Sequence, residues 1–228
     1  AGSRYLDPDG SFPNHIPNPE NETAMQSILD AVQESKADLG IIFDTDVDRA
    51  GAVLSDGTEL NRNRIIAMMA AILLREHPGT TIVTDSITST GLAAFIRKHG
   101  GVHHRFKRGY RNVINESMRL NREGHDSQLA METSGHGALK ENYFLDDGAY
   151  LVTRLLIELA SAKKEGYTLE SLIADLAEPA ESKEFRMNIL VPDFKAYGQK
   201  IIDELNVYAA SQPGWSVAPD NFEGVRVN

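Results

Sequence analysis

The chain has 228 residues, with 33 acidic and 23 basic side chains and a formal net charge of −10. An acidic chain repels nucleic acid and anionic membranes at long range, so we expect neither as a partner. The absence of cysteine excludes disulfides, thiolate catalysis and cysteine-type zinc sites, and no run approaches the roughly 18 apolar residues of a membrane span. We expect a soluble intracellular protein, of the cytoplasm or a plastid.

The first part of the chain predicts a loop, a helix and two strands. Residues 1–20 are rich in proline, glycine and asparagine, which are typical of loops. Residues 20–36 carry apolar side chains at helical spacing, and residues 39–43 form a short apolar run that predicts a buried parallel strand. Residues 52–60 predict a strand and a turn.

The rest of the chain alternates between predicted helices and strands. We expect helices over residues 64–75, 91–98, 113–120 and 147–162, and strands over residues 80–85 and 128–132. The composition changes near Glu178-Pro179, after which we expect a strand at 185–191, a helix at 194–207 and a strand at 225–227. The fold class is therefore α/β, with two layered α/β units that have mixed or mostly parallel sheets and an incomplete C-terminal α+β piece.

An acidic segment, Asp44-Thr45-Asp46-Val47-Asp48-Arg49, follows the first expected strand. Three carboxylates at alternate positions repel one another unless a cation neutralises them. Carboxylate oxygens suit Mg²⁺, so Asp44, Asp46 and Asp48 are the candidate metal ligands. Arg49 adds a guanidinium that can bind a phosphate oxygen. The alternative is an acidic surface turn.

A basic segment at residues 103–111 contrasts with the acidic chain. It contains Lys107, Arg108 and Arg111, and Gly109 allows backbone amides to approach an anion. The alternative interpretation is a solvated basic turn, which is the usual role of such runs.

Residues 131–136, Met-Glu-Thr-Ser-Gly-His, predict a strand end followed by a glycine turn. Glu132, Ser134 and His136 together offer the donors and acceptors that sugar hydroxyls need. The alternative is a polar strand end without a ligand. Asp146-Asp147 could be catalytic or bind metal, but we favour Asp147 or its neighbour as a cap on the following helix.

Read together, these segments resemble the α-D-phosphohexomutase superfamily, the phosphomannomutase and phosphoglucomutase enzymes. The resemblance runs over nearly the whole chain and in the right order. It is carried by the Asp-x-Asp-x-Asp-Arg segment, by Lys-Arg-Gly-Tyr-Arg at 107–111, and by Glu-Thr-Ser-Gly-His at 132–136 with its continuation to residue 156. It implies that residues 1–58 are the C-terminal part of the second family domain, that residues 59–177 are the third domain, and that residues 178–228 are the start of the fourth.

The resemblance also implies a mechanism. In the family mechanism, a phosphoserine on the first domain donates its phosphoryl group to a hexose 1- or 6-phosphate. The resulting bisphosphate intermediate then returns its other phosphoryl group to the serine. Mg²⁺ would be held by the three aspartates, while Arg49, His136 and Arg111 would act in catalysis. Glu132, Ser134, Lys107, Arg108 and Gly109 would bind the hexose phosphate or hexose bisphosphate.

The sequence departs from the family pattern in four ways. Thr45 and Val47 stand where small residues, often glycine, are usual, and Met131 replaces a common glycine. Arg111 stands where one branch has lysine, and arginine is a poor general base because it stays charged. No Ser-His-Asn-Pro segment occurs, so we expect the chain to lack domain 1 of its parent and to be inactive alone.

Two rival functions remain. Residues 41–47 fit the pattern of a haloacid-dehalogenase-like phosphatase, in which Asp44 would be the nucleophile and Asp46 the acid or base. That interpretation leaves Asp48, Arg49 and residues 132–136 unexplained. The other rival is a catalytically silent fragment that binds sugar phosphate.

Overall fold

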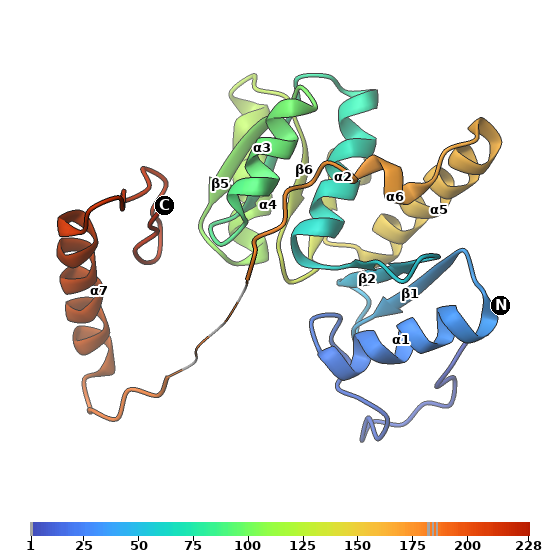
Figure 1. Cartoon of the computed structure of the whole chain (residues 1–228), viewed down its shortest axis with the longest axis horizontal. Helices are drawn as coiled ribbons and strands as arrows, with labels where there is room; N and C mark the ends of the chain where they lie inside the picture. The colour runs from blue at the N-terminus through green and yellow to red at the C-terminus, as the bar shows by residue number, and fades with distance from the viewer. Residues whose placement is uncertain (1, 182, 184, 186) are drawn as a thin grey trace. The chain divides into compact units, whose positions relative to one another are not determined.

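The computed structural model describes residues 2–181, 183, 185 and 187–228. The chain divides into two compact units, one that extends to Glu178 and one that begins at Pro179. The first contains two sheets and most of the helices (Figure 1). In the described part of the chain, no helix is long and apolar enough to cross a membrane.

The first sheet is antiparallel and has the strand order β1-β2-β3, formed by Leu39–Phe43, Ala50–Leu54 and Glu59–Leu60. The expectation of a buried parallel strand at residues 39–43 was wrong, because β1 pairs antiparallel with β2 and only alternate β1 residues are buried. The physical reason is the short segment at residues 44–49, which reverses the chain. Helix α1 (Glu22–Ser35) covers this sheet. The predicted strand and turn over residues 52–60 are confirmed by the β2–β3 hairpin.

The second sheet has the strand order β5-β4-β6-β7, from Val102–Phe106, Thr81–Asp85, Ser127–Met131 and Gly137–Leu139. Strand β4 runs parallel to β5 and β6, and β7 is antiparallel to β6. This mixed, mostly parallel sheet confirms the predicted α/β class. Helices α3 (Thr90–Lys98) and α4 (Tyr110–Arg122) connect the parallel strands.

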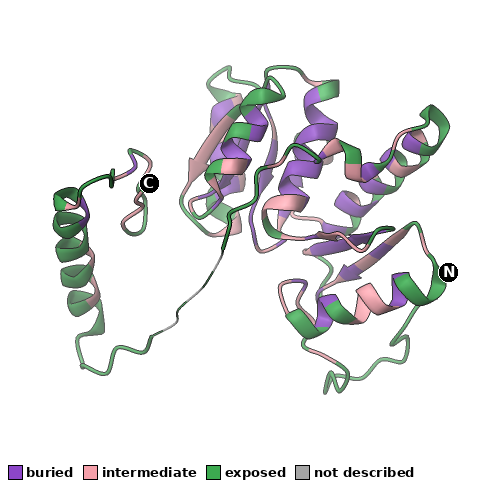
Figure 2. Cartoon of the chain, viewed as in Figure 1, coloured by how far each residue is buried: buried purple, intermediate pink, exposed green. Residues whose placement is uncertain are grey.

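Side chains alternate between the two faces of this sheet. Ile82 and Leu129 pack in a cluster with α2 (Arg62–Glu76), whereas the next residues along, Val83 and Ala130, pack in a cluster with α4. Helices therefore cover both faces, which explains why the central strands β4 and β6 are almost wholly buried (Figure 2).

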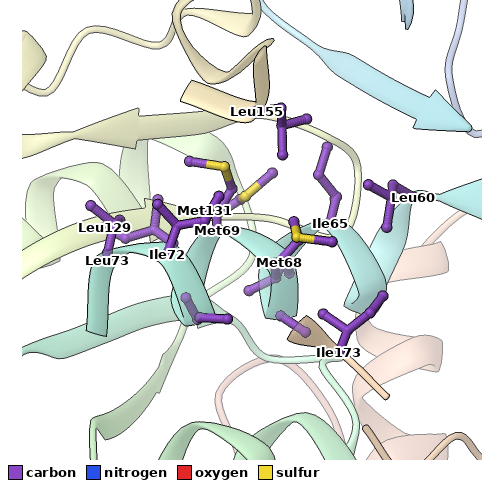
Figure 3. Packing of buried hydrophobic residues seen from close by; sticks show 14 of the residues in the cluster. Leu60, Ile65, Met68, Met69, Ile72, Leu73, Leu129, Met131, Leu155 and Ile173 are labelled. Carbon is purple, nitrogen blue, oxygen red and sulfur yellow. The ribbon is translucent and has the colours of Figure 1, made fainter. Parts of the chain in front are cut away.

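Helix α2 is the centre of the largest core. Every residue from 65 to 74 is buried, so this helix is apolar on all sides. Figure 3 shows its side chains between those of the second sheet, of α5 (Gly148–Glu165) and of Leu60 in β3. The same cluster contains Ala52 and Leu54 of β2, so one continuous core joins the two sheets.

Strand β5 was not predicted. Its sequence, Val-His-His-Arg-Phe, is too polar to read as a strand of a parallel sheet. It lies at the edge of the sheet, where one row of backbone groups has no neighbouring strand and the side chains are only partly buried, so polar side chains are tolerated there.

The last elements of the first unit are the 3₁₀ turn η1 (Lys140–Asn142), the long helix α5 and the short helix α6 (Leu169–Leu172). Asp147 caps α5 by accepting a hydrogen bond from the Tyr150 N–H at 2.9 Å, as predicted. The second unit contains α7 (Phe194–Ser211), which confirms the expected helix.

The two strands expected in the second unit were wrong. The described residues between 185 and 191 form no regular structure, while residue 186 lies outside the described residues. Residues 225–227 contribute one isolated bridge, between Val217 and Val227. A strand needs a partner along its length, and an apolar pattern alone does not supply one.

Candidate active site

The carboxylate loop, residues 44–49, is the turn between β1 and β2. Arg49 holds Asp44 twice, with its backbone N–H on Oδ1 at 3.1 Å and its Nε on Oδ2 at 2.6 Å. Burial raises the pKa of Asp44, but these hydrogen bonds and the charge of Arg49 outweigh burial and leave its pKa lowered. Asp44 is therefore a fixed carboxylate at the base of the loop.

Ligand atoms of Asp44, Asp46 and Asp48 all lie within 4.8 Å of one another. Burial, together with the charges of Asp44 and Asp146, raises the pKa of Asp48 to about 6, although His136 opposes the shift. Among the described residues, Asp48 Oδ1 is buried without a hydrogen-bond partner. A bound divalent cation would supply that partner and relieve the repulsion, so the three side chains fit a hard metal ion such as Mg²⁺.

The loop backbone is strained at Val47, which has a φ of +65°. A β-branched residue rarely adopts this left-handed conformation, because its Cβ crowds the following carbonyl oxygen. Gly148, the first residue of α5, donates its N–H to the Val47 carbonyl at 3.0 Å. A Cβ on Gly148 would lie 2.8 Å from that oxygen, so only glycine fits without a shift.

The β6–β7 loop, residues 132–136, lies beside the carboxylate loop. His136 and Arg49 form a backbone bridge, and Ala50 donates its N–H to Gly135 at 3.5 Å. A Cβ on Gly135 would lie 3.1 Å from the Ala50 oxygen, and its φ is +99°. This loop thus depends on glycine to approach β2 closely.

Glu132 is buried, and protein groups contact both of its carboxylate oxygens. Oε1 accepts the Gly109 N–H at 2.5 Å, and Oε2 accepts the Ser134 hydroxyl at 3.3 Å. Gly109 is at the N-terminus of α4, where unpaired N–H groups favour an anion. The predicted anion-binding amide therefore binds an internal carboxylate in this structure.

The imidazole of His136 lies within a cluster of carboxylates. Its Nδ1 lies 2.7 Å from Asp146 Oδ2 and 3.7 Å from Asp48 Oδ1, and its ring stacks on Tyr110 at 4.8 Å between centroids. Burial lowers the pKa of His136, but the hydrogen bond and charge of Asp146, with the charge of Asp48, leave its pKa raised.

The residues of the predicted basic segment fall into two groups, one that binds within the fold and one that is exposed. His103, His104 and Arg105 belong to β5 and bind within the fold, to Thr84, Glu116 and the α3 N-terminal region respectively. Lys107 and Arg108 are exposed at the end of the strand. Arg111 is also exposed, and its guanidinium contacts the ring and hydroxyl of Tyr110.

Asp85 ends β4 and is fully buried beneath the β6–β7 loop. Its Oδ2 accepts the Thr133 hydroxyl at 2.7 Å, while Oδ1 has no partner among the described residues. Burial raises the pKa of Asp85 to about 6, and Glu132 adds to the shift while Thr133 and Arg108 oppose it. Asp85 therefore anchors the loop that carries Glu132 and His136.

Three loops that are distant in sequence thus meet, and each follows a strand. The contacts join the carboxylate loop to residues 132–136 through Arg49 and His136, and residues 132–136 to residues 107–111 through Glu132 and Gly109. The sequence did not point to Asp85 or Tyr110 as site residues, and for Asp146 it offered catalysis or metal binding as the alternatives to a helix cap. The pair Asp146-Asp147 before a glycine-led helix was the available signal, but only its second member is the cap.

The fold and the site define a two-sheet α/β protein whose carboxylate cluster faces a loop rich in sugar-type hydrogen-bonding groups. Residues 61–180 match the family model of the phosphoglucomutase/phosphomannomutase alpha/beta/alpha domain III. Residues 3–57 match the model of alpha/beta/alpha domain II of the same family. The chain belongs to the phosphoglucomutase/phosphomannomutase family, within the α-D-phosphohexomutase superfamily. This assignment sets aside the haloacid-dehalogenase-like alternative.

Individual relatives agree with this assignment. The chain is 31% identical over 224 residues to a phosphoglucomutase of Neisseria meningitidis, a match that covers 98% of this chain and 46% of the relative. It is 33% identical over 229 residues to a phosphomannomutase/phosphoglucomutase of Pseudomonas syringae, and this match covers 99% of this chain and 46% of the relative. A crystal structure of a family protein from Burkholderia thailandensis has a TM-score of 0.78 at 30% identity, and the match covers 97% of this chain and 44% of that one. The chain spans about half the length of the curated relatives that it matches.

Proposed function

We propose that this chain forms the metal-binding and sugar-reading part of a Mg²⁺-dependent hexose-phosphate mutase. The observation that carries the proposal is the meeting of three loops. The carboxylate cluster of residues 44–48 lies beside His136, and the Glu132 carboxylate joins this region to the basic residues after β5. The similarity of the chain to relatives named phosphoglucomutase and phosphomannomutase supports a mutase reaction on a hexose phosphate.

In this proposal Asp44, Asp46 and Asp48 would hold Mg²⁺, which supplies positive charge to the phosphoryl oxygens during transfer. Arg49 keeps Asp44 ionised and in place through Nε. Among the described residues its two terminal nitrogens make no hydrogen bond, and they are the donors that would bind a phosphoryl oxygen.

Glu132 and Ser134 would hold hydroxyls of the hexose. Their mutual hydrogen bond is 3.3 Å long, so a sugar hydroxyl can replace it at little cost. Lys107, Arg108 and Arg111 would attract the second phosphate of the substrate, because their side chains are exposed near the same loop. His136 would exchange a proton with a sugar hydroxyl or phosphate oxygen.

The substrate is a hexose phosphate or a hexose bisphosphate, and a phosphoserine would act as the donor. These 228 residues contain no Ser-His-Asn-Pro segment, so we expect them to bind the sugar phosphate without turning it over. A catalytically silent fragment would bind sugar phosphate in the same way. The two alternatives differ only in whether a larger protein that contains this segment and the donor serine catalyses the mutase reaction.

Calorimetric titration tests binding. We expect the chain to bind glucose 1-phosphate or mannose 1-phosphate in the presence of Mg²⁺, and to bind Mg²⁺ alone more weakly than the low-micromolar range of tight sites. The absence of hexose-phosphate binding would refute the proposal. A coupled assay with glucose 1-phosphate and its bisphosphate tests turnover, and robust activity of these 228 residues would contradict the expected need for a separate donor serine.

A further inference from the structure

Asp146 lies between η1 and α5, and its carboxylate is fixed from two sides. Oδ2 lies 2.7 Å from His136 Nδ1, and Oδ1 accepts the backbone N–H of Gly137 at 3.1 Å. The backbone at Asp146 pairs with Ala138 of β7, and the Asp147 N–H donates to the Gly137 carbonyl at 3.2 Å. The position of the Asp146 carboxylate is therefore determined by β7, the strand that directly follows His136.

The imidazole of His136 is held equally firmly. One face stacks on Tyr110, with 21° between the planes, and the His136 carbonyl accepts the Glu132 N–H at 2.9 Å. The distance from Nδ1 to Asp48 Oδ1 is 3.7 Å, which exceeds hydrogen-bond length. Asp146 is thus the hydrogen-bond partner of Nδ1, and in the described part of the chain Nε2 makes no hydrogen bond.

We infer that Asp146 is a positioning residue that fixes neutral His136 in the tautomer with the proton on Nδ1. A carboxylate only accepts hydrogen bonds, so the nitrogen that contacts it must carry the proton. The other nitrogen, Nε2, then presents a lone pair. In the proposed mutase, on which this last step rests, Nε2 accepts a proton from a sugar hydroxyl, and Asp146 keeps the ring in the orientation for that transfer.

The substitution Asp146→Asn should reverse the tautomer. The side-chain oxygen of asparagine is needed by the Gly137 N–H, so its NH₂ group would face His136 Nδ1 and require a lone pair there. The proton of His136 then moves to Nε2. The substitution Asp146→Ala removes the partner altogether and should give a mixture of both tautomers.

Nitrogen-15 labelled imidazoles distinguish the tautomers by long-range ¹H–¹⁵N NMR at a pH high enough to make His136 neutral. The chain has seven histidines, and loss of one signal in a His136→Gln variant assigns the resonance. We expect the Nδ1–H form to exceed the Nε2–H form by at least about tenfold in the unmodified chain, the ratio expected for a hydrogen bond to a charged group. We expect the Nε2–H form to predominate in Asp146→Asn.

The neighbouring substitution Asp147→Asn is the matched control, because asparagine also caps helices well and the Asp147 carboxylate binds the Tyr150 N–H and the Asn142 side chain rather than His136. It should leave the tautomer unchanged. Predominance of Nε2–H in the unmodified chain would overturn the inference even if the variants fail to fold, as would a folded Asp146→Asn variant that keeps Nδ1–H. The measurement needs no substrate, so it is independent of the outcome of the hexose-phosphate titration.

Discussion

The backbone N–H of Gly148 donates a hydrogen bond to the carbonyl oxygen of Val47 at 3.0 Å, which attaches the start of α5 to the carboxylate loop. The loop that carries the candidate metal ligands therefore lies directly on the end of a helix whose other side is in the main core. The position of the loop depends on how closely these two backbone segments approach.

The substitution Gly148→Ala should disturb this contact. The new Cβ would lie 2.8 Å from two backbone atoms, the Val47 oxygen and the Arg49 carbonyl carbon, which cannot move independently of the loop. We expect the free energy of unfolding to fall by about 1–3 kcal/mol and Mg²⁺ binding to weaken, as measured by urea denaturation and calorimetry. Gly10→Ala is the control, since nothing lies within 4 Å of its Cβ position. Equal behaviour of the two variants would refute the role of this contact.

A second prediction concerns the φ of +65° at Val47. Glycine adopts this conformation without the steric cost that a Cβ imposes, which is about 1–2 kcal/mol per residue. Comparison of Val47→Gly with Val47→Ala isolates the effect of the Cβ. We expect the glycine variant to be the more stable by about 1 kcal/mol, the reverse of their order in a helix. A more stable alanine variant in thermal or urea unfolding would show that the loop is not strained.

Asp85 should make folding stability depend on pH. Burial raises its pKa from the usual 3.8 to about 6 in the folded chain, so the folded state favours the protonated form. A pKa raised from 3.8 to about 6 corresponds to a penalty for ionisation of about 3 kcal/mol at most at neutral pH, and this penalty disappears as pH falls from about 6 to about 4. The substitution Asp85→Asn removes the charge and keeps an acceptor for Thr133.

Urea denaturation of both chains over this pH range measures the effect. The advantage of the Asp85→Asn variant over the unmodified chain should be largest near pH 7.5 and should shrink on acidification. A difference in unfolding free energy that stays constant with pH would contradict a raised pKa at Asp85.

Asp46 offers the least disruptive test of the metal site, because its side chain is exposed whereas Asp44 is buried. We expect Asp46→Asn to lower Mg²⁺ affinity at least about tenfold, since a neutral amide replaces one of three anionic oxygens. The control is Asp38→Asn, which alters an exposed carboxylate that pairs with Lys163. Unchanged Mg²⁺ binding in Asp46→Asn would exclude this side chain as a ligand.

The substitution Glu132→Gln should weaken hexose-phosphate binding. The glutamine oxygen can still accept the Gly109 N–H, so the loops stay joined, but the charge that strengthens hydrogen bonds to sugar hydroxyls is lost. We expect the dissociation constant for glucose 1-phosphate to rise about 10- to 100-fold. Glu123→Gln, at an exposed residue paired with Arg119, should leave it unchanged.

The sequence predicted the components of the site better than their arrangement. The spacing of Asp44, Asp46 and Asp48 after an apolar run was enough to locate a carboxylate cluster, because that pattern is local. The direction of β1 was mispredicted because it depends on the reversal of the chain at residues 44–49, which no periodicity reveals. The strand β5 was missed because an edge strand tolerates polar residues.

The partners of the site residues could not be read from the sequence for a related reason. Asp146 contacts His136 only because β7 and the segment after η1 pair through Ala138. Asp85 reaches Thr133 only because β4 and β6 are neighbours in the sheet. Both contacts are consequences of strand order. The roles of Glu132, Ser134, Lys107 and Arg111 in substrate binding stay predictions.

The all-round burial of α2 has a consequence for any attempt to dissect the protein. Its core includes Leu60 and Leu54 on one side and Leu129 on the other, so a cut between the segments that match the two family domains would expose apolar surface on both products. Neither piece would retain a complete interior. The segment up to residue 178 should therefore melt in a single cooperative transition, and limited proteolysis should leave it uncut between β3 and α2.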